Sequence, residues 1–270
     1  MDLEDHNLAQ IKRLNQRGGR TLSIVDLIED GTITAEMAGF CWLAVAGGGS
    51  FLTGAVPGGA GKTTLMATLL GFLPPGERIV TVSDRAVVDR ALAGNVEPPA
   101  TVLSHEIGSG SWFGYIWGRT AADFFRLTGR GLRCVSCLHA DGPQQTREQL
   151  LSLGVREEDL QRIRLQLYMR MERGGGGVLR RTRTLHYRRD GACHELYRWD
   201  PSGDQFEDEI DRAEICSLLA DSLGMDSPEA GALWEEATGL VRGWCEQGIR
   251  QFADVRALVR QTYAEWEGRV

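Results

Sequence analysis

The feature that most constrains the fold is a glycine-rich loop in the segment FLTGAVPGGAGKTTLM at residues 51–66, between an apolar strand and a helix. Glycine lets the backbone wrap closely around a phosphate, so that loop N–H groups and the helix N-terminus face the anion. The pattern predicts a phosphate-binding loop at Gly58–Thr64. The strict motif has glycine where this chain has Val56, but that position lies at the edge of the loop. The predicted binding residues are Gly58, Gly59, Ala60, Gly61, Lys62, Thr63 and Thr64.

The type of loop also predicts its ligands. Lys62 would reach the β and γ phosphates of a nucleoside triphosphate, and Thr64 could contact the α phosphate. The hydroxyl group of Thr63 would bind Mg²⁺. We therefore expect ATP and Mg²⁺ as ligands.

Short apolar strands alternate with helices around this loop. We expect strands at 50–54, 78–82, 101–107 and 132–139, and helices at Lys62–Leu70, 85–93, 116–127 and 144–152. Before the loop, residues 21–46 read as two helices around a turn at Gly31, the second of them capped by Thr34. This alternation predicts an α/β fold, a P-loop NTPase core with a mainly parallel sheet.

The organisation changes beyond Gly154. We expect a charged helix at Glu157–Tyr168, a flexible break or turn at Gly174–Gly177, and a small β-hairpin with its turn at Asp190-Gly191. The pattern is helical from Ile210 to the end. The predicted organisation is an N-terminal extension at 1–20, an ATPase core with leading helices at 21–170, a glycine-rich break and hairpin at 171–209, and a helical C-terminal region at 210–270.

Composition excludes several classes of protein. The formal net charge of −7 argues against direct nucleic-acid binding, because phosphate backbones are bound by clustered cations. The arginines of the hairpin segment are expected to form a solvated face or to meet an acidic neighbouring subunit; they are Arg180, Arg181, Arg183, Arg188 and Arg189. The longest apolar stretch, Ala38–Ala46, is about half the length of a membrane-spanning helix, so we expect a cytoplasmic protein.

The six cysteines are too scattered for a secreted disulfide framework, so we expect reduced thiols. Cys134 and Cys137 have the spacing of a metal or redox pair. However, a second pair that would complete a metal site is missing, and strand alternation would point the two sulfurs to opposite faces. We interpret them as residues that fill the core.

Three segments around the loop resemble the ATPases that drive type II and type IV secretion, type IV pili and the archaellum. The leader and loop at 21–84 are similar to the family's leader, its loop and the strand that carries its acidic pair. LTGRGLRCVSCLHAD at 127–141 resembles the family's T-G-H-x-G and the strand ending in T-L-H-A. WCEQGIRQFADVRALVRQTYAEW at 244–266 is similar to the closing helices of archaeal members.

The resemblance implies roles for single residues. Asp84 corresponds to the second acid of the acidic pair, whose first acid is replaced by Ser83. His139 corresponds to the histidine that couples the nucleotide site to domain movement. Glu106 is the best counterpart of the catalytic glutamate, whereas an alternative register places Gly114 and Tyr115 there and loses the glutamate. We prefer Glu106, because residues 101–107 form a credible core strand.

The resemblance further implies a homo-oligomer, a hexameric ring, that hydrolyses ATP at the cytoplasmic face of a membrane platform protein. The family's large amino-terminal domain is missing before this core, which suggests a partial or accessory version. Between Asp84 and the strand at 101–107, only Arg85 and Arg90 could replace the family's phosphate-stabilising arginines. The alternative is therefore an accessory subunit that binds ATP without hydrolysing it. A second alternative is a small-molecule or nucleotide kinase, which would need an arginine-rich lid over the phosphates, whereas the dense arginines here fall on the predicted hairpin well after the core.

Overall fold

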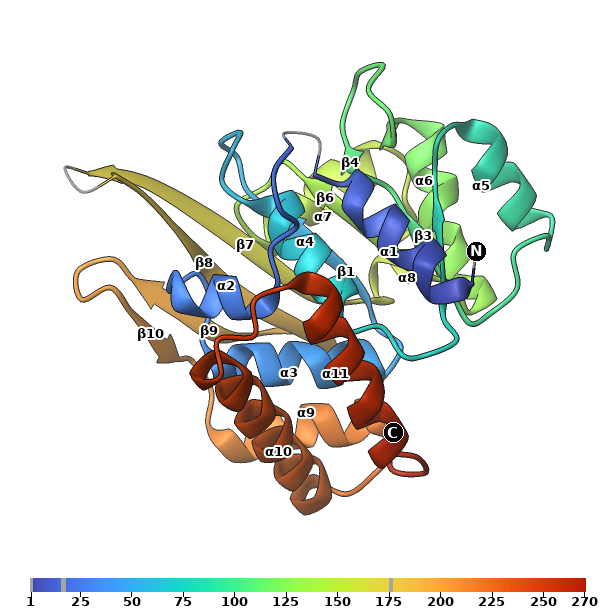
Figure 1. Cartoon of the computed structure of the whole chain (residues 1–270). Helices are drawn as coiled ribbons and strands as arrows, with labels where there is room; N and C mark the ends of the chain where they lie inside the picture. Colours follow the sequence, from blue (N-terminus) through green and yellow to red (C-terminus); the bar gives the residue numbers. More distant parts are fainter. Residues whose placement is uncertain (1, 16–17, 175–176) are drawn as a thin grey trace.

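A single mixed β-sheet forms the centre of the computed structural model, which describes residues 2–15, 18–174 and 177–270 (Figure 1). The strand order is β2, β3, β6, β1, β7, β8, β9, β10. The first five of these strands are parallel, and the last three extend the sheet in antiparallel pairs. Their bounds are β1 Ser50–Gly54, β2 Arg78–Thr81, β3 Ala100–Leu103, β6 Arg133–Leu138, β7 Ile163–Gly174, β8 Gly177–Arg189, β9 Ala192–Asp200 and β10 Gln205–Asp208.

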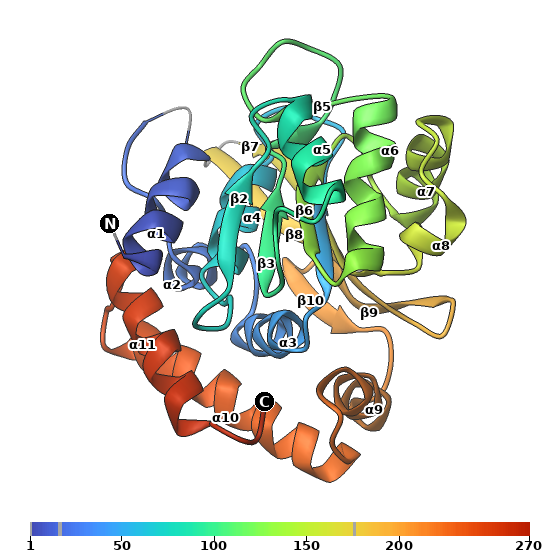
Figure 2. The same cartoon turned by 90° about the vertical axis from the view of Figure 1, so that its right-hand side faces the viewer.

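Helices cover both faces of the parallel part of the sheet (Figure 2). On one face lie α1 (Leu3–Arg13), α3 (Ala35–Ala46) and α4 (Lys62–Leu70). On the other face lie α5 (Arg85–Leu92), α6 (Arg119–Arg126), α7 (Pro143–Ser152) and α8 (Glu157–Leu160). All residues of β1, β3 and β6 are buried, as expected for strands covered on both sides. The predicted α/β fold with a mainly parallel sheet is confirmed.

The leader before the loop forms two helices, as predicted. α2 (Ile24–Glu29) ends before Gly31, which has a φ of 70°. α3 begins after Thr34, whose hydroxyl oxygen accepts a hydrogen bond from the Met37 N–H at 3.1 Å. Within α3 the buried Trp42 stacks on Phe72 with ring centroids 5.3 Å apart, which packs the leader against the end of α4.

The two cysteines of β6 point to opposite faces of the sheet. The Cys134 sulfur lies 3.2 Å from the Phe124 carbonyl oxygen of α6, whereas the Cys137 sulfur lies 3.6 Å from the Met66 sulfur of α4. All six cysteines are free thiols. In the described ranges, no group of three or more His, Cys, Asp or Glu side chains could hold a metal ion. The two sulfurs therefore fill the core on either side of the sheet, as predicted.

The predicted helix at Glu157–Tyr168 is wrong. Only Glu157–Leu160 is helical, and β7 begins at Ile163. Leu165 and Leu167 of β7 both face the core formed with α3 and α4, and β7 pairs in parallel with β1 from Ile163 to Tyr168. This alternation has the period of a strand, and pairing with β1 overrides the helix signal of the acidic residues before it.

The predicted hairpin at Asp190-Gly191 is confirmed. These two residues join β8 to β9 and have φ values of 49° and 81°. Two successive left-handed residues are typical of a two-residue turn that matches the twist of the strands. The break predicted at Gly174–Gly177 falls at the end of the long β7–β8 pair, and its residues 175 and 176 lie outside the described part of the chain.

The helical C-terminal region is also confirmed, and it packs on the outside of α3. It consists of α9 (Arg212–Leu223), α10 (Ser227–Glu246) and α11 (Phe252–Glu265). The guanidinium of Arg256 in α11 is buried, donates to the carbonyl oxygens of Gly71 and Leu73, and pairs with Glu4 of α1 at 2.8 Å. These contacts attach the region to the end of α4. No helix in the described residues is long and apolar enough to cross a membrane.

Candidate active site

The glycine-rich loop connects the end of β1 to the first residue of α4, as predicted. Gly59 and Gly61 have φ values of 82° and 101°, in the region that favours glycine. Val56 is outside the left-handed region. Its N–H donates to the Asp141 carboxylate at 2.9 Å, and its carbonyl oxygen lies 2.9 Å from Nδ1 of His139. The backbone at this position therefore does not require glycine, which explains why Val56 is compatible with the loop.

Lys62 begins α4 with its side chain almost fully buried, at 6% exposure. The carbonyl oxygen of Lys62 accepts a hydrogen bond from the Thr53 hydroxyl of β1, which fixes the first turn of the helix. Its ammonium nitrogen lies 3.8 Å from Oε2 of Glu106. A buried ammonium needs a compensating charge, and Glu106 supplies it.

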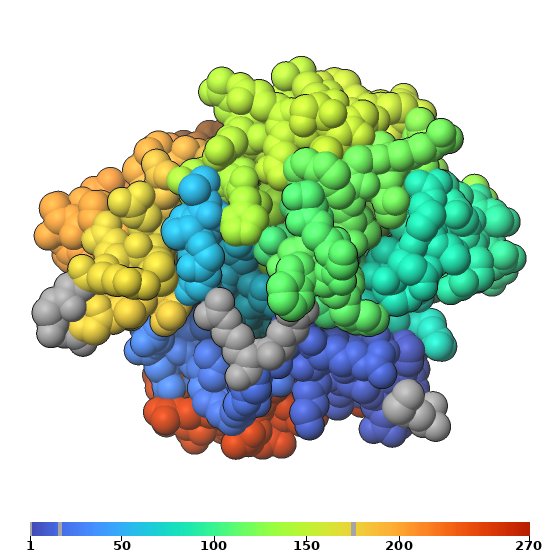
Figure 3. Space-filling model, turned by 90° about the horizontal axis from the view of Figure 1, so that it is seen from above, coloured from blue at the N-terminus to red at the C-terminus, as the bar shows by residue number. Residues whose placement is uncertain are grey.

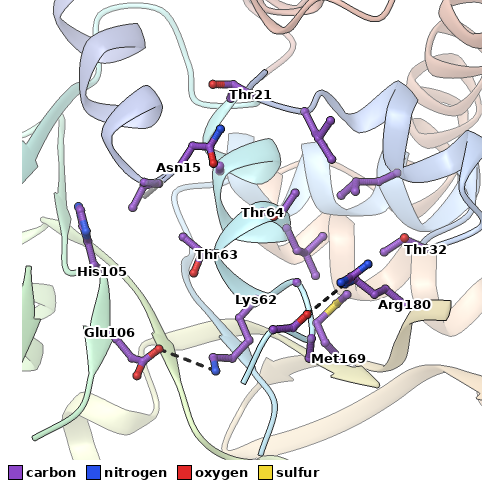
Figure 4. Close-up of a pocket in the computed structure, with 18 of the residues that line it drawn as sticks. Asn15, Thr21, Thr32, Lys62, Thr63, Thr64, His105, Glu106, Met169 and Arg180 are labelled. Carbon is purple, nitrogen blue, oxygen red and sulfur yellow. Dashed lines mark hydrogen bonds and ion pairs between the residues drawn. The ribbon is translucent and has the colours of Figure 1, made fainter. Parts of the chain in front are cut away.

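Glu106 reaches the loop because the chain breaks after β3. The predicted strand at 101–107 divides into β3 and the short β4 (Glu106–Ile107), which pairs with β5 (Tyr115–Ile116) and β6. The hydroxyl of Ser104 and the N–H of His105 both donate to the Gly114 carbonyl oxygen, at 3.0 and 2.8 Å. This turn redirects the chain so that Glu106 lies in the cavity beside Lys62 (Figure 4).

Gly114 is required for this turn. It has a φ of 77°, and a β-carbon there would lie 2.5 Å from Cγ of His105. Burial lowers the pKa of His105 to about 4, so its ring is neutral at neutral pH.

The predicted helix at 116–127 begins only at Arg119, because β5 occupies Tyr115–Ile116 and Gly118, with a φ of 55°, precedes the helix.

His139 follows β6 and contacts both Glu106 and the glycine-rich loop. Its Nε2 lies 3.1 Å from Oε1 of Glu106, while its Nδ1 contacts the loop backbone at Val56. Tyr115 also lines the cavity, and burial together with the neighbouring Glu106 raises the pKa of its phenol. The structure thus brings Lys62, Glu106 and His139 together. Tyr115, which the alternative register placed at the position of the glutamate motif, lies in the same cavity.

Asp84 lies elsewhere. It caps α5, with its carboxylate accepting a hydrogen bond from the Val87 N–H at 3.3 Å. The Ser83 hydroxyl donates to the same carboxylate and, together with backbone N–H groups, lowers its pKa. β2 is separated from β1 by β3 and β6, and three steps of about 4.8 Å place the two strands roughly 14 Å apart. Asp84 is absent from the lining of the cavity.

The cavity has a volume of about 570 Å³ and is bounded by the loop, β4, the end of β6 and the β7–β8 pair. Figure 3 shows the blue loop on one face between the yellow end of the β7–β8 pair and the green segment that follows β4. This volume lies within the usual range for small-molecule sites. Apolar side chains from the leader and α1 line its other end, namely Ile11, Leu14, Leu22 and Leu27.

Thr63 lines the same cavity one residue after Lys62. Mg²⁺ is commonly bound by one or two protein oxygens together with substrate phosphates and water, rather than by a complete cage of side chains. One hydroxyl beside a phosphate-binding loop fits that mode of binding. Thr63 and the phosphate oxygens would hold the ion, which would neutralise negative charge on the phosphates.

One cation of this site is not predicted from the sequence. Arg180 and Arg181 do not form a solvated face. Arg180 lines the cavity, and its Nε donates to the Gly59 carbonyl oxygen at 3.0 Å. Arg181 is buried and pairs with Asp204 at 2.7 Å. The sequence predicted strands here, but it did not indicate how far the β7–β8 pair extends beyond β1.

The parallel sheet and the strand, glycine loop and helix at residues 50–70 define an α/β fold of the P-loop NTPase class. Neither a protein-family model nor a curated protein sequence matches the chain. Among solved structures, the VirB11 ATPase of the Brucella suis type IV secretion system is similar, with 16% identity, a TM-score of 0.43, and coverage of 69% of this chain and 62% of that chain.

Two further solved structures are similar to this chain. The ATPase DotB of Legionella pneumophila has 15% identity and a TM-score of 0.39, over 76% of this chain and 54% of that one. The ATPase DotB of Yersinia pseudotuberculosis has 10% identity and a TM-score of 0.42, over 87% of this chain and 62% of that one. The chain therefore spans less than two thirds of the length of each of the three proteins.

Proposed function

We propose that this chain binds ATP with Mg²⁺ and hydrolyses it as a motor subunit of a type II or type IV secretion, pilus or archaellum-like system. The observation that carries the proposal is the cluster of Lys62, Glu106 and His139 beside the glycine loop. The class of system is inferred from the sequence resemblance of the leader, the segment at 127–141 and the closing helices.

Each member of the cluster has a role in this proposal. The loop N–H groups and Lys62 bind the phosphates, and Thr63 binds Mg²⁺. Glu106 accepts a proton from the attacking water while the oxygen of that water bonds to the γ phosphorus. The bond from that phosphorus to the bridging oxygen breaks, which gives ADP and phosphate. His139 links Glu106 to the loop backbone at Val56, so movement of the loop would also move the catalytic carboxylate.

A lysine-directed nucleotide probe tests the binding step directly, because Lys12 and Lys62 are the only lysines in the chain. An acyl-phosphate derivative of ATP should acylate Lys62, and excess ATP with Mg²⁺ should prevent the labelling. Lys12 is exposed on α1 and serves as the internal control. Peptide mass spectrometry measures both sites. Labelling of Lys62 that ATP does not reduce would contradict nucleotide binding.

The rate of ATP hydrolysis distinguishes a motor subunit from an accessory subunit that only binds ATP. The displacement of Asp84 from the cavity favours the accessory subunit, because the site then lacks one acid that the resemblance implies. Steady-state phosphate release by the purified protein, compared with Lys62→Ala as the background control, decides between them. Equal rates for the two proteins, with tight ATP binding by the unaltered one, would overturn the motor and support the accessory subunit.

Two substitutions in the loop should differ in their effect on ATP affinity. Val56→Gly should leave ATP affinity within about twofold, because neither its backbone conformation nor its two backbone contacts require a particular side chain. Gly61→Ala should weaken ATP binding by about tenfold or more, because Gly61 has a φ of 101° and a β-carbon would press on Met169 and Arg180. Titration with a fluorescent ATP analogue measures both. Equal affinities for the two variants would contradict the proposed loop function.

The proposed assembly is a homo-oligomeric ring, a hexamer by the sequence resemblance, at the cytoplasmic face of a membrane platform protein. Such a ring would place ATP near a boundary between subunits. Mass photometry of the purified protein with and without ATP and Mg²⁺ measures the oligomeric state. A monomer under both conditions would overturn the ring while leaving nucleotide binding intact.

A further inference from the structure

The β7–β8 pair brings an arginine over the glycine loop. β1 pairs with β7 only as far as Gly54 and Tyr168, whereas β7 continues to Gly174 and returns as β8. Arg180 lies opposite Met171, three residues past Tyr168. At about 3.3 Å per residue, this position lies roughly 10 Å beyond the end of β1, at the level of the loop.

Contacts with two glycines fix the side chain of Arg180. Its Nε donates to the Gly59 carbonyl oxygen at 3.0 Å. Its Cδ and the Cε of Met169 pack against Gly61, where a β-carbon would lie 3.4 and 3.3 Å from them. Figure 4 shows Arg180 and Met169 close together at the loop, on the side opposite Glu106. The guanidinium is therefore held at the cavity wall before any ligand binds.

The described residues leave the two terminal nitrogens of Arg180 available for a ligand. No hydrogen bond from Nη1 or Nη2, and no ion pair of Arg180, is formed with the residues that the structure describes. The neighbouring Arg181 differs, because its guanidinium is used by Asp204 and by the carbonyl oxygens of Asp30 and Arg180. An arginine stays protonated and presents its donors in a planar fork that matches phosphate oxygens.

The charge in the cavity shows what Arg180 adds. Lys62 is paired with Glu106, so these two charges offset one another. Arg180 is a further cation on the opposite wall, with no acidic partner among the described residues, whereas Arg20, which also lines the cavity, pairs with Asp26. In a nucleotide bound by the loop N–H groups and the helix N-terminus, a cation on the rim of the loop would be placed to contact a phosphate that extends beyond them.

We propose that Arg180 contacts the terminal phosphate and makes the site prefer a nucleoside triphosphate over the corresponding diphosphate. This inference rests on the proposed function, since it assumes that a nucleotide occupies the loop. It assigns to β8 of the same chain a phosphate-binding arginine that the segment between Asp84 and β3 does not provide. The site would then detect the difference between ATP and ADP without an arginine from a neighbouring subunit.

The test compares nucleotide affinities of Arg180→Ala, Arg180→Lys and the unaltered protein. Isothermal titration with Mg²⁺ and either ADP or a non-hydrolysable ATP analogue gives the affinity for each. Arg180→Ala should weaken binding of the triphosphate by about tenfold or more and that of ADP by less than about threefold. Arg180→Lys should recover part of the loss for the triphosphate, because it keeps the charge and loses the fork.

Arg183 provides a matched control, because it lies on the same strand and outside the cavity lining. Arg183→Ala should leave both affinities unchanged. Equal weakening of both nucleotides in Arg180→Ala would show that Arg180 only supports the loop through Gly59, and this would overturn the inference. Unchanged affinity for the triphosphate would also overturn it. Failure of the unaltered protein to bind either nucleotide would overturn the proposed function, and this inference with it.

Discussion

Glu106→Gln should lower the rate of ATP hydrolysis by about 10²- to 10⁴-fold, the usual contribution of a general base. Glutamine keeps the shape of the side chain but cannot accept the proton of the attacking water. Binding of ATP should persist or become tighter, because Lys62 would no longer be paired with a carboxylate at 3.8 Å. Single-turnover hydrolysis and equilibrium titration with the same preparation measure the two effects separately.

Two other acidic residues make this experiment specific. Glu97 is exposed in the loop before β3, so Glu97→Gln should change neither rate nor affinity. Asp84→Asn keeps a side chain that can cap α5 and should leave hydrolysis unchanged, because Asp84 does not line the cavity. A loss of hydrolysis in Asp84→Asn would show that α5 moves toward the loop in the working protein. An unchanged rate in Glu106→Gln would contradict the catalytic role of Glu106.

The part of the site that sequence predicts is the part built from local structure. The loop, Lys62 and the start of α4 depend on consecutive residues, so their geometry follows from the motif. Glu106 and His139 follow β3 and β6, whose carboxyl ends lie on the same side of the parallel sheet as the carboxyl end of β1. Residues that follow parallel strands collect at one edge of a sheet, so the two residues that the family resemblance singled out lie close together beside the loop.

The rest depends on strand order and strand length, which the sequence does not show. Asp84 also follows a parallel strand, but β2 is at the edge of the sheet and its end is remote from the loop. Arg180 reaches the loop only because β7 and β8 extend far beyond β1. Because β7 pairs with β1, the segment predicted as one helix at Glu157–Tyr168 forms a short helix followed by the start of β7.

A buried ion pair connects the amino-terminal ends of β1, β2, β3 and β6, on the side of the sheet opposite the loop. Arg133, the first residue of β6, forms two hydrogen bonds to the Glu77 carboxylate, at 2.8 and 2.9 Å. The same carboxylate accepts the Thr101 hydroxyl of β3, and Arg133 also donates to the Gly49 carbonyl oxygen before β1. Glu77 and Arg133 are each only 5% exposed.

Glu77→Ala should lower the free energy of unfolding by about 3–5 kcal/mol, because it leaves the charge of Arg133 buried without a partner. Urea denaturation measures this loss. The exposed pair of Arg147 and Glu157, also 2.8 Å apart, provides the control, since Glu157→Ala should cost about 1 kcal/mol or less. Equal losses for the two variants would contradict a structural role for the buried pair.

The contribution of Glu77 to the free energy of unfolding should also depend on pH. The direction of this dependence follows from the lowered pKa of its carboxyl group. Burial alone would raise the pKa of Glu77, but the hydrogen bonds and charge of Arg133 outweigh burial and hold it below the ordinary value of 4.5. A carboxylate with a lowered pKa stabilises the folded state above its ordinary pKa, and this contribution is lost as the pH falls through the lowered value. The difference in unfolding free energy between the parent and Glu77→Ala should therefore be constant near neutral pH and shrink below about pH 4.5. A difference that grows on acidification would mean that Arg133 does not stabilise the charged form of Glu77.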